Sequence, residues 1–269
     1  MLTTTTESIP LSVEYILSLT SHLDTNGISS LDYRLLALAT GVILVLIRHF
    51  AGEKGGIEWH SFLHAIITGV GAAMCIHLNS YAAEITGGPP EPLRTLNCAG
   101  PLTSLHKILP SITLGYSITD IINGFSLGKI DFIFHGFLTS FGALLACTQD
   151  IHYNAAEFLV MEISTIFLTM IKVEIFGEAG QVFLMGMFAL SFIIVRNIIA
   201  PYRWASFLWV YYQEYNMKGD VCFSMNKLYA VTIIGAFFHL LNLFWMYKII
   251  KKIQRKLSGN ERKSDAKLE

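Results

Sequence analysis

The chain has 269 residues, of which 53% are hydrophobic and only 14% are charged. An ordinary soluble domain has about a quarter of its residues charged, so this composition argues against a soluble enzyme or signalling domain. The formal net charge is −1, and no basic face outside the C-terminal tail supports nucleic-acid binding. We therefore expect an all-α, polytopic membrane protein, a transmembrane helix bundle in which hydrocarbon replaces water as the solvent.

The N-terminal 30 residues contain no Lys or Arg. They also lack the basic region and apolar core of a cleavable signal peptide. Within them, residues 8–20 ("SIPLSVEYILSLT") place Ile9, Val13 and Ile16 on one helical face, but this stretch is too short and too polar to span. We expect an interfacial helix there. A disordered leader is the alternative.

A transmembrane helix needs about 20 mostly apolar residues, and about seven stretches meet this length or approach it. They are residues 31–50, 60–84, 106–127, 131–148, 155–176, 181–200 and 226–248. Only the short "SLGK" turn separates the third stretch from the fourth. These two stretches are therefore predicted to form a helical hairpin.

Lys and Arg are distributed unevenly among the connecting segments, and cytoplasmic loops usually carry the excess. One set of segments contains Arg48, Lys54, Lys129 and a tail with eight basic residues, whereas the other contains Arg94, Arg203 and Lys218. This asymmetry predicts a lumenal or exterior N-terminus and a cytosolic C-terminus. The tail is expected to lie against anionic lipid heads, unless it serves only to set the topology.

This topology divides the chain into four regions. They are a lumenal N-terminal segment (1–30), a first span with its cytosolic loop (31–56), a membrane domain (57–250) and a basic cytosolic tail (251–269).

Several ionisable residues fall inside the predicted spans, where they are costly and point to function. They are His64, His77, Asp120, Asp131, His135, Glu157, Glu162 and Arg196. Arg196 stands among branched aliphatic residues in "FIIVRNII", so it requires an acid in the bundle interior. Glu162 is the preferred partner, ahead of Asp120. The alternative to a functional site is a buried ion pair that only fixes how the helices pack.

Asp131 and His135 are four residues apart and lie on one helical face. That arrangement could serve general-base chemistry. Alternatively, Asp131 is an acid at a helix start, where the helix dipole stabilises it.

Five segments occur in an order that resembles the TLC family of membrane proteins. They are "EWHSFLHAIITG", "GYSITDII", "KIDFIFHGFLT", "VMEISTIFL" and "FIIVRNIIAPY". This family groups ceramide synthases with lipid-homeostasis and cargo-receptor proteins of the endoplasmic reticulum. The resemblance covers residues 57–250 and implies a TLC-like bundle in that compartment, with the plasma membrane as the alternative.

The resemblance also identifies a departure from the enzymes of the family. Ceramide synthases carry paired histidines followed by a threonine, whereas this chain has His135, Gly136 and Thr139. The acidic stretch that follows in those enzymes has no counterpart here. The resemblance therefore favours a branch of the family without ceramide-synthase activity.

From these patterns we expect a polar core that binds or senses lipid and contributes to membrane lipid homeostasis. Its candidate residues are His64, Tyr116, Asp120, His135, Thr139, Glu162, Ser164 and Arg196. No catalytic residue is assigned, although His135 and Asp131 are candidates. The alternatives are a ceramide-synthase-like acyltransferase that uses His135, and a cargo receptor or transporter. We expect no cofactor and no metal, and the sequence leaves the oligomeric state open.

Four cysteines are too few for a disulfide framework. Cys75 and Cys147 lie in apolar runs and are expected to be core residues. Cys98 and Cys222 fall in predicted loops on the oxidising side of the membrane, where disulfides persist. A disulfide between these two is predicted, and two unrelated cysteines are the alternative.

Overall fold

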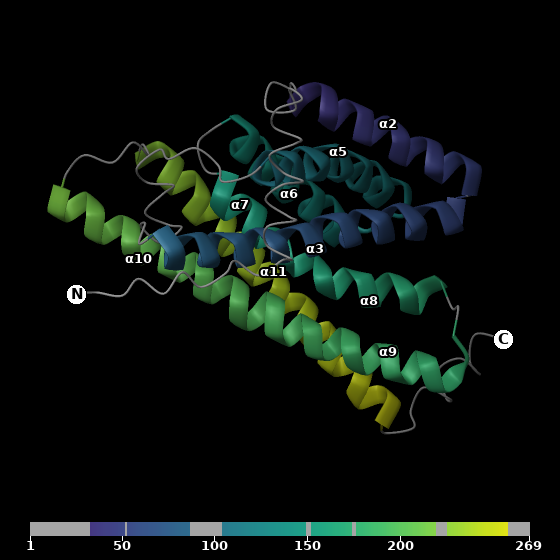
Figure 1. Cartoon of the computed structure of the whole chain (residues 1–269). Coiled ribbons are helices and arrows are strands. Elements are labelled where there is room, and N and C mark those ends of the chain that lie inside the picture. The colour runs from purple at the N-terminus through teal and green to yellow at the C-terminus, as the bar shows by residue number, and fades with distance from the viewer. Residues whose placement is uncertain are drawn as a thin grey trace.

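The computed structural model describes residues 33–51, 53–86, 104–148, 152–173, 176–218 and 225–257. All regular secondary structure within these ranges is helical, and the helices form a bundle (Figure 1). The interfacial helix expected at 8–20, the end of the basic tail, Cys98 and Cys222 lie outside the described residues. The predictions made for them stay predictions.

The first four predicted spans correspond to four helices of the structure. They are α2 (Tyr33–Ala51), α3 (Glu53–Thr86), α5 (Leu105–Ser126) and α6 (Ile130–Thr148). Helix α5 lies in the interior, where it contacts α2, α3, α6 and α7. More than half of its residues are buried, many of them small or polar. Because protein surrounds this helix, it does not need the apolar surface of a lipid-facing span.

The fifth predicted span, 155–176, is not one continuous helix. It consists of α7 (His152–Phe158), the 3₁₀ turn η2 (Leu159–Met161) and α8 (Glu162–Val173). The tighter turn breaks the helix and makes Glu162 the first residue of α8. A carboxylate is favoured there because the N-terminal end of a helix carries partial positive charge.

The sixth predicted span was expected to end at residue 200, and this boundary is wrong. Helix α9 (Glu178–Ser191) continues through the π-helical segment η3 (Phe192–Ile199) into α10 (Ala200–Lys218). The apolar run ends at Pro201, but a helix accepts proline in its first turn, and Pro201 is the second residue of α10. Residues 201–218 of the predicted loop are therefore helical, and α9, η3 and α10 form one long rod (Figure 1).

Helix α11 (Met225–Leu257) is the last described helix and crosses this rod at η3, whereas α2 lies at the opposite edge of the bundle (Figure 1). In the described part of the chain, five helical stretches are long and apolar enough to cross a membrane. They are Tyr33–Phe50, Trp59–Ser80, Ile130–Cys147, Glu178–Asn216 and Met225–Arg255. Helices α5 and α7–α8 occupy the positions of the other two predicted spans.

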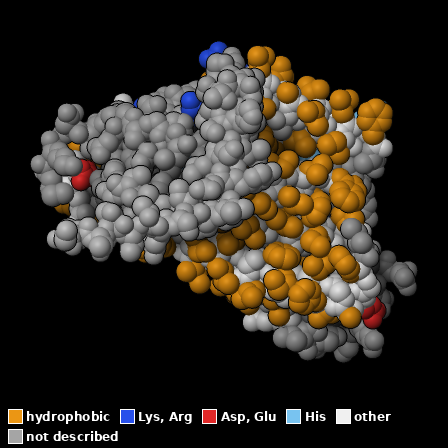
Figure 2. All heavy atoms as spheres, in the orientation of Figure 1, with side chains coloured by type: hydrophobic (Ala, Val, Ile, Leu, Met, Phe, Trp, Pro, Cys, Tyr) orange, Lys and Arg blue, Asp and Glu red, His pale blue; other side chains and the backbone are white. Residues whose placement is uncertain are grey.

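The outer surface of the bundle is largely apolar. Where Figure 2 shows described residues, on the right of the view, hydrophobic side chains predominate and few charges are visible. Phe50, Phe183 and Leu240 are examples, with 82%, 66% and 62% of their surface exposed. Water would oppose so much exposed apolar area, whereas lipid chains accept it. The surface therefore supports an integral membrane protein.

The hairpin predicted between α5 and α6 is present, and glycines shape it. Gly128 in the connecting turn has a φ of 62°, a conformation that favours glycine. Further along α6, Gly136 faces α5 so closely that a Cβ atom there would lie 2.6 Å from Ile121 Cγ1 and 3.2 Å from the Ser117 carbonyl oxygen. The missing side chain lets the two backbones approach, as small residues do between membrane helices.

Gly136→Ala is expected to lower the unfolding temperature of the detergent-purified protein, although alanine favours a helix by about 1 kcal/mol over glycine. The added methyl group would collide with Ile121 and force α5 and α6 apart. Gly186→Ala in α9 is the matched control, because a Cβ atom there meets nothing within 4 Å. Thermal unfolding monitored by tryptophan fluorescence measures both variants. Equal behaviour of the two would contradict this account of the hairpin.

Candidate functional site

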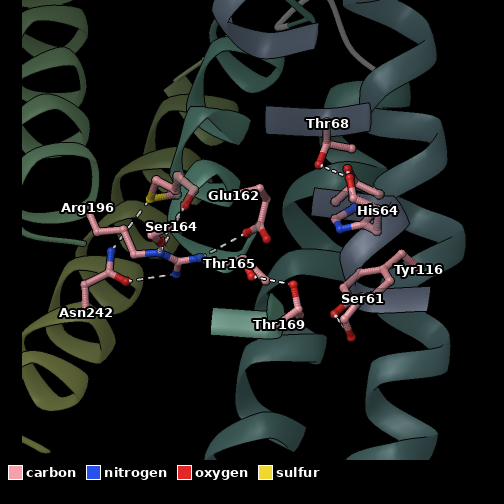
Figure 3. Close-up of polar contacts among 12 residues, drawn as sticks. Ser61, His64, Thr68, Tyr116, Glu162, Ser164, Thr165, Thr169, Arg196 and Asn242 are labelled. Carbon is pink, nitrogen blue, oxygen red and sulfur yellow. Dashed lines mark hydrogen bonds and ion pairs between the residues drawn. The ribbon is translucent and has the colours of Figure 1, made fainter. Parts of the chain in front are cut away.

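Arg196 lies at the centre of the polar core and is only 5% exposed. Its Nη2 atom donates to Glu162 Oε1 at 3.2 Å, forming an ion pair, and to Thr165 Oγ1 at 3.0 Å. Its Nε atom donates to Ser164 Oγ at 2.8 Å and to the carbonyl oxygen of Met161 at 3.2 Å (Figure 3). The predicted pairing of Arg196 with Glu162 is confirmed.

Helix α11 completes the surroundings of Arg196. Arg196 Nη1 donates to Asn242 Oδ1 at 3.4 Å, and Asn242 Nδ2 points to Met161 Sδ at 3.7 Å. The guanidinium carbon also lies 5.4 Å from the ring centre of Phe192 and 5.8 Å from that of Trp245, distances typical of cation–π contacts. One side chain thus connects η3, α8 and α11.

Local backbone geometry brings these groups together. Arg196 stands in the π-helical segment η3, and π turns are rare and often found at functional positions. Glu162 starts α8, and α3 approaches this start closely because Gly69 has no side chain. A Cβ atom on Gly69 would lie 3.0 Å from the backbone nitrogen of Ile163.

His64 and Tyr116 form a second part of the polar core, between α3 and α5. Their rings stack with centres 3.8 Å apart and planes 6° from parallel. His64 Nε2 lies 3.3 Å from Thr113 Oγ1, and the Tyr116 hydroxyl lies 3.3 Å from Ser61 Oγ. Asp120, which is 6% exposed, follows Tyr116 by one helical turn of α5. The structure therefore places all three predicted residues in the interior.

His135 and Asp131 do not form the predicted acid–imidazole pair. Asp131 Oδ2 accepts hydrogen bonds from Lys248 Nζ at 2.8 Å and from Trp245 Nε1 at 3.3 Å. His135 contacts Trp245 and Phe238 with its ring, at centre distances of 5.3 Å and 6.0 Å. The carboxylate thus holds the end of α11 to α6 and shows no contact that would orient the imidazole.

Gly136 occupies the position where ceramide synthases have their second histidine. Because a Cβ atom at this position would lie 2.6 Å from Ile121 Cγ1 and 3.2 Å from the Ser117 carbonyl oxygen of α5, a side chain there would force these neighbours to shift. The glycine therefore serves the packing of α5 on α6. With glycine at position 136, His135 stands alone where the paired-histidine motif of ceramide synthases would supply two imidazoles.

A second buried polar cluster was not predicted. Glu157, only 1% exposed, forms an ion pair with Arg203 and accepts a hydrogen bond from Asn79 Nδ2 at 2.7 Å. Asn79 Nδ2 also lies 3.2 Å from His106 Nε2. Sequence reasoning missed the pair because it assigned Arg203 to a loop. A helix extended past residue 200 would have placed the arginine within reach of α7.

Asn242 was missed as well, although a signal for it exists. It is the only amide side chain in the apolar run between residues 231 and 247. A lone amide at that depth needs a partner, just as Arg196 does.

An apolar cavity of about 140 Å³ lies next to the polar core. Helices α5, α6, α7, α10 and α11 wall it together with η2, and its lining includes Thr139, Ala143, Trp204, Phe207 and His239. Thr113 and Met161 also line it, and both contact polar-core residues. Of the predicted site residues, Thr139 lines the cavity, whereas Glu162, Ser164 and Arg196 do not.

A family model of the TLC domain matches residues 54–251, more than half of the chain. The chain belongs to the TLC-domain family. The polar core and the cavity both fall within the matched residues. Searches of curated proteins and of solved structures found no match. Within the described ranges, no three His, Cys, Asp or Glu side chains gather closely enough to hold a metal ion.

Arg196→Leu is expected to destabilise this TLC-domain protein by several kcal/mol, because removing one member of a buried pair leaves the other charge unpaired. The double variant Arg196→Leu/Glu162→Gln should recover part of the loss, since it removes the stranded carboxylate. Arg196→Leu/Asp120→Asn is the matched control and should recover nothing. Membrane accumulation and unfolding temperature in detergent measure the effect. If stability recovers in Arg196→Leu/Asp120→Asn but not in Arg196→Leu/Glu162→Gln, the assigned pairing is wrong.

Proposed function

We propose that this TLC-domain protein binds a lipid within its helix bundle and thereby contributes to membrane lipid homeostasis. The observation that carries the proposal is the apolar cavity beside the polar core. Apolar concave sites with a few polar groups are the usual form of small-ligand sites. Family membership adds that proteins of this kind work within membranes, where the available apolar ligands are lipids.

We assign the ion pair of Arg196 and Glu162 the role of holding the cavity wall in place, not of binding the lipid headgroup. The donors of Arg196 are engaged by Glu162, Ser164, Thr165, Asn242 and the Met161 carbonyl, so a lipid headgroup would have to displace a protein partner. These contacts fix Met161 and α11, which form part of the cavity wall. The polar core thus holds the cavity open, and the lipid occupies the apolar space.

The site is proposed to work in the endoplasmic reticulum, the compartment that the resemblance implies. The lumenal N-terminus and cytosolic C-terminus rest on the distribution of Lys and Arg. Helix α11 carries exposed Lys248, Lys251, Lys252 and Arg255 toward its C-terminal end. These four cations support contact of that end with anionic lipid heads. No nucleic-acid partner is proposed.

Ala143→Phe is expected to reduce the lipid that co-purifies with the protein. Ala143 is 7% exposed and lines the cavity, so a phenyl ring there would fill the space that the lipid needs. The protein would be purified in a mild detergent, washed, and extracted for quantitative lipid mass spectrometry. Bound lipid per protein should fall several-fold relative to wild type.

The matched control is Leu240→Phe, which adds an aromatic ring on the outer surface of α11, where Leu240 is 62% exposed. Its bound lipid should equal that of wild type. Thermal unfolding of both variants checks that Ala143→Phe still folds. If wild type and folded Ala143→Phe retain the same lipid in the same amount, the cavity is not the binding site.

Acyl transfer is the second candidate function, and one observation favours it. His135 is held against Trp245 and Phe238, and its Nδ1 atom is buried without a hydrogen-bond partner among the described residues. A free nitrogen could accept a proton from an attacking amine. The engagement of Asp131 by Lys248 and the glycine in place of a second histidine at position 136 argue against this candidate.

We expect the purified protein to show no acyl-CoA-dependent ceramide synthesis above that of the His135→Ala variant. The expectation rests on the packing role of Gly136 and on Asp131 being bound to Lys248. The assay follows conversion of a labelled long-chain base by mass spectrometry. Turnover that is robust in wild type and lost in His135→Ala would replace lipid binding with acyl transfer as the proposed function.

A further inference from the structure

Besides Thr113, which contacts His64, the wall of the cavity carries three polar side chains from three different helices. Thr139 comes from α6, Trp204 from α10 and His239 from α11. The rings of Trp204 and His239 meet edge to face with centres 5.0 Å apart. These residues are far apart in the sequence, and only the packed bundle brings them to one wall.

The polar atoms of these side chains are buried and lack partners among the described residues. They are Thr139 Oγ1, Trp204 Nε1, and both His239 ring nitrogens. Buried polar groups in native proteins are nearly always hydrogen-bonded to protein, water or ligand. Four unsatisfied atoms on one wall of a cavity therefore point to a hydrogen-bonding group that enters from outside the protein.

The position of Trp204 depends on a glycine. The indole lies directly against Gly235 of α11, and a Cβ atom there would lie 2.6 Å from Trp204 Cδ1. Only glycine leaves room for the ring in this place. The Nε1 edge of the ring, the part nearest to Gly235, therefore packs against the α11 backbone at the wall of the cavity.

Among the described residues that line the cavity there is no Asp, Glu, Lys or Arg. Arg196 and Glu162 of the polar core do not line the cavity and are paired with each other. A phosphate or ammonium group would enter this apolar space without a counter-charge, which is strongly unfavourable. The ligand group that fits is therefore uncharged.

The hydrogen-bond donors and acceptors on the cavity wall indicate which uncharged ligand group fits. The Trp204 indole only donates, whereas the Thr139 hydroxyl and a neutral imidazole each donate and accept. A hydroxyl group matches this set, because it can accept from Trp204 and donate to His239. The cavity volume of about 140 Å³ is close to the roughly 150 Å³ of a cavity that binds benzene. It therefore holds one end of a lipid and not a whole molecule.

We propose that the cavity selects an uncharged lipid by its hydroxyl-bearing end, which hydrogen-bonds to His239, Trp204 and Thr139. This inference rests on the proposed lipid-binding function and adds the class of lipid. A sterol and a diacylglycerol share the required chemistry, a single hydroxyl on an otherwise apolar body. Phospholipids, which have a charged headgroup, are excluded from the wall.

The test uses the full-length protein in phosphatidylcholine nanodiscs with four diazirine-bearing probes. They are a sterol, a diacylglycerol, a phosphatidylcholine and a phosphatidylserine. After photolysis, cross-linked peptides are identified by mass spectrometry. At least one hydroxyl probe should label cavity-lining peptides of α6, α10 or α11, and the matching unlabelled lipid should compete. The sterol and diacylglycerol arms distinguish the two sources of the hydroxyl group.

His239→Leu should weaken labelling of the cavity by about two- to tenfold, the range expected for the loss of one hydrogen bond. His239→Gln, which keeps a donor and an acceptor, should restore most of it. Trp204→Phe is the second variant and should also reduce labelling, independently of any folding defect at position 239. His49→Leu is the matched control, because His49 is an exposed histidine of α2.

The outcomes separate this inference from the proposed function. If hydroxyl and phospholipid probes label the cavity equally and His239→Leu changes neither, selection by the hydroxyl group is wrong, while lipid binding stands. If no probe labels the cavity peptides of wild type, both proposals fail. The inference would also be wrong if His239→Leu and His239→Gln reduced labelling of the cavity by the hydroxyl probe equally while Trp204→Phe left that labelling unchanged.

Discussion

The fold depends on one requirement, that a guanidinium group in the middle of a membrane bundle must never be without partners. Arg196 meets it with a carboxylate, two hydroxyls, an amide and a backbone carbonyl, drawn from α8, η2 and α11. Loss of any of these hydrogen-bond partners would be costly at this depth, because no water is available in the hydrocarbon region to replace the partner. The positions of three helical segments around η3 are therefore coupled to a single side chain.

Close backbone approaches supply the complementary constraint. The missing side chain of Gly69 lets the start of α8 approach α3, and that of Gly136 lets α5 approach α6. At Gly235 it lets the Trp204 ring pack against α11. Between lipid chains and apolar helices there is little hydrophobic gain from association, so close packing and polar contacts determine the arrangement. The cavity lies next to these contacts, and Met161 and Trp204 belong both to its wall and to the contacts.

Residue patterns predicted much of this arrangement. Hydropathy located the helices of the bundle except α10, and the cost of an unpaired charge led from Arg196 to Glu162 without structural information. The errors came where local pattern and tertiary packing disagree. The predicted span ended at residue 200, just before Pro201, but the helix continues through α10, where Arg203 pairs with Glu157 of α7.

The 3₁₀ turn before Glu162 has no clear composition signal, since Leu159, Val160 and Met161 would also suit an α-helix. Asp131 and His135 share a helical face, yet their partners come from α11, which helical spacing alone could not indicate. The cavity was also beyond sequence reasoning. Its polar residues come from α6, α10 and α11 and show no common spacing along the chain.

The rod formed by α9, η3 and α10 has a consequence for how the protein sits in its membrane. Its span-like stretch, Glu178–Asn216, has 39 residues, which corresponds to about 58 Å at 1.5 Å per residue. A bilayer is only about 40–45 Å thick with its headgroups. The rod must therefore incline steeply or protrude from the bilayer. Its C-terminal half, α10, exposes Tyr202, Trp209 and Tyr212, aromatic residues of the kind that favour the membrane–water interface. A thinner or thicker bilayer would change the tilt of the rod, and Arg196, fixed near its middle, would act as the pivot.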